Sequence, residues 1–102
     1  MAIAETTLVS NSSGSNATSY TPASITPTAN ELILVAIANQ AATTAETVAP
    51  TLTGNSLTYV SIVSILYPND SGVRRLSLDR AMGASPAAGA ITIDFAGNTQ
   101  LR

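Results

Sequence analysis

The chain is a succession of short apolar segments separated by turn formers, and this pattern constrains its fold more than any other feature. Clusters of Gly, Pro, Asn and Ser interrupt the apolar segments. No amphipathic helical stretch of roughly 10–15 residues lies between them. Short strands joined by turns, without connecting helices, are typical of antiparallel all-β proteins. We therefore expect an antiparallel β-sandwich, jelly-roll-like or with another Greek key topology.

Two segments carry the clearest strand patterns. Residues 31–38 are apolar, β-branched and short, which is typical of a strand buried on both faces; a buried helix is the alternative. Residues 90–95 alternate between apolar and polar side chains, so Ile91, Ile93 and Phe95 are predicted to point inward. Both segments are therefore assigned as strands.

Other strands are shorter or less regular. A short strand is expected within residues 3–9, and Pro22 confines the strand at residues 19–26 to a sheet edge or a bulge. Residues 51–53 and 57–66 flank a Gly-Asn-Ser turn and predict a β-hairpin, with the side chains of the second segment alternating between two faces.

Turn and loop signals separate the remaining segments. Residues 39–50 are rich in Ala and Thr, lack an apolar stripe and are expected to form a loop. Residues 67–72 contain Pro, Asn, Asp, Ser and Gly and predict a turn. Residues 73–82 alternate again and predict a strand.

Charge is scarce in this sequence. Charged residues make up 10% of the 102 residues, against about 25% in a typical soluble domain, and the formal net charge is -2. All four basic residues are arginine, whereas lysine on edge strands is a common protection against strand-to-strand pairing. We therefore expect association with copies of the same chain. Binding to nucleic acid or to a membrane surface is not expected, because both need clustered basic residues.

The residue types of most catalytic and metal sites are missing. The chain has no His and no Cys, so it cannot build a Ser-His-Asp arrangement, an imidazole metal site or a thiolate metal site. The spacing of its carboxylates does not place two of them at one site, as glycoside hydrolysis requires. We therefore expect a protein that is not an enzyme and that uses no cofactor or metal.

Four residues are candidates for contacts with a ligand or a partner. Tyr59 or Tyr67 could stack on a sugar ring. Asp70 and Arg74 could supply polar contacts to the same sugar. Packing in the core or at its rim is the competing role for each tyrosine, and a turn between strands is the competing role for Asp70.

One domain preceded by an arm is the expected organisation. Residues 1–18 end in a run of Ser, Asn and Gly without apolar periodicity, which predicts a flexible N-terminal arm or loop. Residues 19–102 carry the strand pattern and are predicted to form the β-sandwich domain. A chain of this length suits a single domain with one core.

Three segments follow one another along the chain: SITPTANELILVA (24–36), PTLTGNSLTYV (50–60) and RLSLDRAMGASPAAGAITI (75–93). In order and spacing they resemble a family of uncharacterised β-sandwich modules that is common in tailed-phage and environmental viral structural proteins. The resemblance covers roughly residues 18–100 and brings no catalytic motif. Family members usually continue with further core strands after the position of residues 98–100, so a neighbouring subunit is expected to complete the sandwich through an exchanged strand or the arm.

The resemblance implies a structural role in a virion or on a surface. The expected function is a self-assembling subunit of a virus particle (capsid decoration, tail or appendage protein) or of an extracellular filament, with copies of itself and other virion or filament proteins as partners. The alternative is a carbohydrate-binding module that recognises a surface glycan on a virion or cell.

Overall fold

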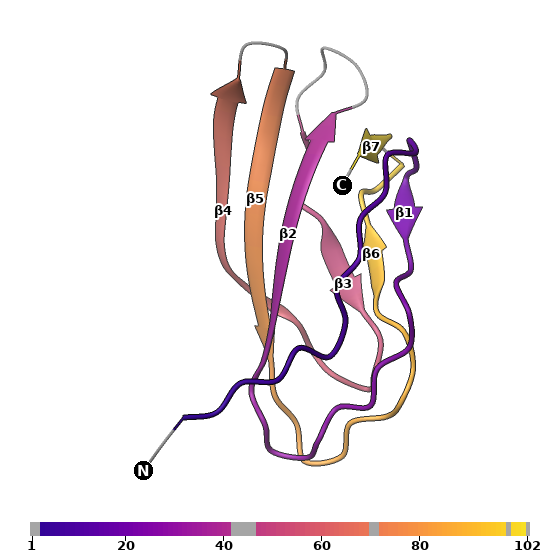
Figure 1. The fold of residues 1–102 in the computed structure, drawn as a ribbon, viewed down its shortest axis with the longest axis vertical. Helices are drawn as coiled ribbons and strands as arrows, with labels where there is room; N and C mark the ends of the chain where they lie inside the picture. Colours follow the sequence, from indigo (N-terminus) through magenta and orange to yellow (C-terminus); the bar gives the residue numbers. More distant parts are fainter. Residues whose placement is uncertain (1–2, 42–46, 70–71, 98, 102) are drawn as a thin grey trace.

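Seven β-strands in two antiparallel sheets form the described part of the fold, which contains no helix (Figure 1). The structure is a computed structural model and describes residues 3–41, 47–69, 72–97 and 99–101. The strands are β1 (Ser19–Tyr20), β2 (Ile33–Ala41), β3 (Thr51–Thr53), β4 (Val60–Asn69), β5 (Gly72–Ala81), β6 (Thr92–Asp94) and β7 (Gln100–Leu101). The all-β prediction is confirmed.

The strands pair in the orders β4-β5-β2-β7 and β1-β6-β3. In the larger sheet, β2 pairs with β5 from Ile33 opposite Ala81 to Gln40 opposite Arg74. Of the described strands, β4 and β5 alone are consecutive in the chain and paired with each other, whereas the other connections pass between the sheets. The three-stranded sheet lies beside β2, so β4 is the strand farthest from it (Figure 1).

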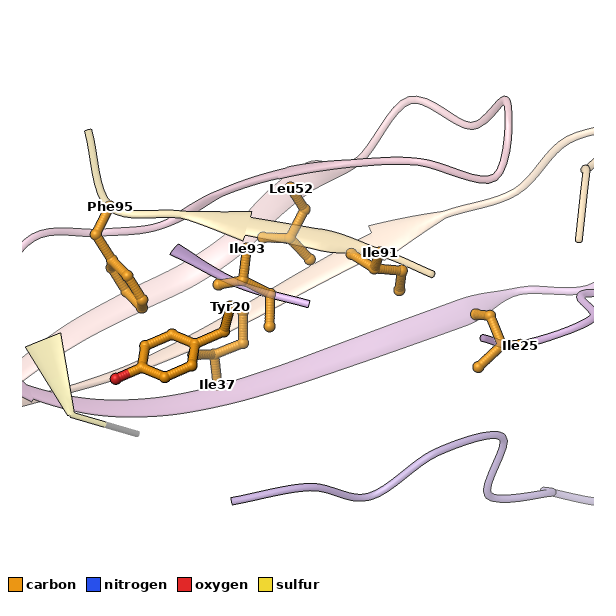
Figure 2. Packing of buried hydrophobic residues seen from close by; sticks show 7 residues of the cluster. All are labelled: Tyr20, Ile25, Ile37, Leu52, Ile91, Ile93 and Phe95. Carbon is orange, nitrogen blue, oxygen red and sulfur yellow. The ribbon is translucent and has the colours of Figure 1, made fainter. Parts of the chain in front are cut away.

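Seven buried side chains from both sheets and their connections form the core. Figure 2 shows them as a cluster between the ribbons: Tyr20, Ile25, Ile37, Leu52, Ile91, Ile93 and Phe95. The inward orientation predicted for Ile91, Ile93 and Phe95 is confirmed, because these side chains are 4%, 5% and 0% exposed. The rings of Tyr20 and Phe95 meet edge to face with their centroids 6.0 Å apart. The Tyr20 hydroxyl shares its single proton between the main-chain carbonyls of Gln100 and Ser15, which ties the C-terminal strand to the arm.

Only one face of β2 is buried, so the prediction of a strand buried on both faces is wrong. Ile33 and Ile37 point into the core, whereas Leu34 on the opposite face is 56% exposed. No second layer in the described part of the chain covers that face. The strand also runs to Ala41, into the predicted loop, where Asn39 Nδ2 donates to the Gln100 side-chain oxygen at 2.8 Å.

The predicted hairpin of residues 51–66 is also wrong, although its turn exists. β3 pairs with β6 and β4 pairs with β5, so the turn carries the chain from one sheet to the other. Leu57 N–H donates to the Gly54 carbonyl, and Asn55 and Ser56 both have positive φ. Gly54 has φ +130°, and a Cβ there would lie 2.7 Å from the Ala90 carbonyl oxygen. This close approach of two backbones requires glycine.

The β4–β5 ribbon is longer than the sequence pattern predicts. β4 continues to Asn69 and β5 begins at Gly72, so the predicted turn at residues 67–72 is wrong in extent; residues 70–71 lie outside the described residues. A β-bulge between Ser61 and Val63 also breaks the predicted regular alternation. Residues 3–9 form no strand, contrary to expectation.

Candidate interaction surface

The four-stranded sheet has a face that points away from the core, which we name the outer face. Residues that pair directly across antiparallel strands share a face, so the two registers define four rows across β4, β5 and β2. In this order of strands the rows are Val60, Arg80 and Leu34; Val63, Leu78 and Ala36; Ile65, Leu76 and Ala38; and Tyr67, Arg74 and Gln40. The two middle rows are wholly apolar, and each end row has an arginine at its centre.

The outer face and β4 together expose a large apolar surface. Eight large apolar side chains there are 39–56% exposed: Leu34, Val60, Ile62, Val63, Ile65, Leu66, Tyr67 and Leu76. Fully burying one such side chain removes roughly 60–120 Å² of apolar area from water, so half-exposure of the six that lie in the outer-face rows amounts to roughly 180–360 Å². The largest apolar patch on a typical monomer covers about 300–600 Å² and often serves an interaction. The surface therefore has the size of an interaction site.

β4 is an unprotected edge strand. It ends the order of the four-stranded sheet, and its side chains at residues 61–67 are all exposed. An edge strand presents free N–H and C=O groups, and charged residues, proline or bulges usually prevent them from pairing with another chain. β4 contains no charged residue, and its bulge at Ser61–Val63 and its Pro68 lie toward its two ends. Residues 63–67 therefore form an open, apolar pairing edge.

Two of the four candidate residues come together on the outer face. Tyr67 and Arg74 lie directly opposite each other in the last row, where Tyr67 is 39% exposed. Arg74 Nε donates to the Gln40 side-chain oxygen at 3.1 Å, which holds the guanidinium over the neighbouring strand. Asp70, the third candidate, lies outside the described residues.

Tyr59 belongs to a different region, just before the opposite end of β4. It packs against the core, and its hydroxyl donates to Asn55 Oδ1 at 3.2 Å; burial raises the pKa of Tyr59. Asn55 Nδ2 in turn donates to the carbonyls of Ala87 and Gly89, both at 2.9 Å. Tyr59 therefore supports the crossing of two connections and does not share a site with Tyr67.

A polar row occupies the inward face of β5. Ser77 and Asp79 are only 2% and 5% exposed. Arg75 donates from Nη1 to Ser64 Oγ at 2.8 Å and from Nη2 to the Thr47 carbonyl at 3.2 Å, while the Ser64 and Ser77 hydroxyls lie 3.0 Å apart. Asp79 Oδ2 has no hydrogen-bond partner among the described residues, and burial raises the pKa of this carboxyl group. The row fills the space beneath β5 with polar groups.

Comparisons with protein-family models, with curated proteins and with solved structures find no match to this chain. Within the described ranges, no helix is long and apolar enough to span a membrane. The same ranges bring no three His, Cys, Asp or Glu residues together as metal ligands. The fold and its surface thus define a small all-β protein with two antiparallel sheets and one open, apolar edge.

Proposed function

We propose that the chain is a non-enzymatic structural subunit that assembles with copies of itself by strand addition at the edge of β4. The observation that carries this proposal is the uncharged and exposed edge at residues 63–67. Strand addition gives affinity through main-chain hydrogen bonds and specificity through the flanking side chains. Exposed apolar side chains on both faces of β4 extend the contact to both sides of a joined sheet.

The charges on the outer face favour strand addition at β4 over face-to-face packing of two outer faces. Both end rows of the outer face carry an arginine, Arg74 or Arg80, and none of its positions is acidic. A two-fold axis between two such faces would bring arginine rows together, and like charges across an interface are unfavourable. Addition at β4 opposes no charges, because the strand has none.

The setting we propose is a virus particle, as a capsid decoration, tail or appendage protein, or an extracellular filament. It is supported by the resemblance of segments 24–36, 50–60 and 75–93 to viral β-sandwich modules. We propose the corresponding fold, a β-sandwich of jelly-roll-like or other Greek key topology. The connections that cross between the sheets after β2 and β5 agree with it.

Sedimentation velocity on matched variants tests the association surface. Ile65→Lys places a charge in the β4 edge and should weaken self-association by about tenfold or more. Leu34→Lys is the control, because Leu34 is equally exposed on the outer face but lies on β2; its association should stay within about twofold of wild type. A wild-type chain that stays monomeric at high micromolar concentration would contradict the proposal, as would equal weakening by both variants.

A carbohydrate-binding module is the second candidate. The observation that favours it is the exposed ring of Tyr67 beside Arg74 and Gln40, since an aromatic face with adjacent polar groups can hold a sugar. Titration with a panel of glycans should then show binding that Tyr67→Ala abolishes. Absence of binding across the panel would remove this candidate.

A further inference from the structure

We propose that the strand added at β4 is the N-terminal arm of a neighbouring copy, residues 3–8, with Glu5 of the arm paired to Arg74 beside the edge. The inference rests on the proposed function and names the segment that occupies the edge. It follows from the state of the arm, from its pattern of side chains and from the charges beside β4.

The first part of the arm is exposed and makes few contacts with the described part of its own subunit. Ile3 is 98% exposed and Leu8 is 45% exposed. Among the described residues, none of residues 3–8 takes part in a hydrogen bond. Val9, in contrast, packs against the core, so the arm is anchored at its base. In Figure 1 the indigo arm crosses below β2 and β5 and leads away from the body. Residues 3–8 are therefore available to another copy.

The length of the arm matches the open edge, and its alternating side chains would lie along both faces of β4. Six extended residues span about 20 Å, and the five edge residues 63–67 span about 17 Å. Side chains two positions apart share a face and lie about 7 Å apart, which is also the spacing between neighbouring rows of the outer face. In an antiparallel pairing with Glu5 opposite Tyr67, Thr7 lies opposite Ile65. Leu8 then lies opposite Ser64 on the other face, diagonal to Leu66, which is 44% exposed.

The charges are complementary. Glu5 is the single acidic residue before Glu31, and the described structure gives it no partner. Arg74 is the one charged side chain in the outer-face rows next to residues 63–67, on the strand about 5 Å from β4. The Arg74 guanidinium is hydrogen-bonded to Gln40 on β2, so to meet Glu5 of an added strand its side chain has to turn from Gln40 across Tyr67. An arm with one carboxylate, at Glu5, complements an edge with one guanidinium beside it.

The arm and the edge are different surfaces, so this contact joins copies head to tail. Contacts of that kind form rings when the rotation closes and open filaments when it does not. Pairing of β4 with β4 of a second copy would instead stop at a dimer. The arm contact therefore allows the extended assembly that a structural subunit needs.

A charge exchange tests the pairing in full-length protein at low salt. One variant carries Glu5→Arg and the other carries Arg74→Glu. Each variant alone places like charges in every contact, so its apparent association should be weakened roughly fivefold or more. In an equimolar mixture, each contact between the two variants pairs opposite charges, either the two exchanged residues or the native Glu5 and Arg74. Association should therefore return to the wild-type level. The weakening should fade at about 1 M salt, where charges are screened within about 3 Å.

Apolar contacts of the arm are tested by Leu8→Asp, with Asn11→Asp as the control outside the segment. Leu8→Asp should weaken association, and Asn11→Asp should leave it unchanged. If the Glu5, Arg74 and Leu8 variants all associate like wild type while Ile65→Lys does not, the arm inference is overturned and self-association at β4 stands. If wild-type protein does not associate at all, the proposed function fails and the inference fails with it.

Discussion

Replacement of Phe95 by alanine should remove a large part of the free energy of unfolding. Phe95 is fully buried, and its ring meets Tyr20 edge to face in the cluster that joins the two sheets. Truncation of a buried phenylalanine to alanine costs about 3–5 kcal/mol. A domain of this size is stable by about 5–15 kcal/mol in total. The variant should therefore be marginal at room temperature.

Urea unfolding monitored by circular dichroism, at protein concentrations below assembly, measures this effect. With a denaturant dependence of about 2 kcal/mol per molar urea, a cost of about 4 kcal/mol lowers the midpoint by about 2 M. Phe95→Leu keeps most of the volume and should cost about 1–3 kcal/mol, so it gives a readable transition if the alanine variant does not fold. Met82→Ala, at a 63% exposed position, is the large-to-small control and should stay within about 0.5 kcal/mol. Equal midpoint shifts for Phe95→Ala and Met82→Ala would refute the proposed position of the core.

Two further predictions concern Asp79 and Gly54. Burial raises the pKa of Asp79, so the folded state favours the neutral carboxyl group. The contribution of this group to folding stability is complete below the unfolded pKa of about 3.9 and is lost as the pH rises through the folded pKa. Asp79→Asn should therefore raise the melting temperature at pH 7 but not at pH 3, and an equal rise at both pH values would contradict this reasoning. Gly54→Ala should lower the free energy of unfolding by about 1–3 kcal/mol, because the added Cβ meets the Ala90 carbonyl oxygen and Gly54 has a positive φ. Gly14→Ala is the control: the space around Gly14 is open, so its melting temperature in the same thermal scan should be nearly that of wild type.

The sequence predicted the strand content of the fold because alternation and turn residues act locally. The inward side chains of residues 90–95 and the strand at residues 73–82 follow from such local patterns. The partner of each strand depends on the path of the chain between sheets, which local patterns do not specify. The turn at residues 54–56 was recognisable, but its two flanking strands belong to different sheets.

Burial was harder to predict than strand position. The apolar run at residues 31–38 is typical of a strand covered on both sides, yet the described residues supply a covering sheet on one side alone. In β5, alternation separates Leu76 and Leu78 from Ser77 and Asp79, but the polar set is the buried one. These leucines are exposed because no described element covers the outer face. The low charge and the absence of lysine over the whole chain predicted association but did not locate it on β4.

Hydrogen–deuterium exchange at two protein concentrations tests strand addition at β4 most directly. In the dilute monomer, the outward-pointing amides of residues 63–67 should exchange quickly, because no strand pairs with them. At concentrations where copies associate, these amides should become protected, whereas β6 at the centre of the smaller sheet should show no change. Protection that does not depend on concentration, or that appears on β2 instead of β4, would contradict the account.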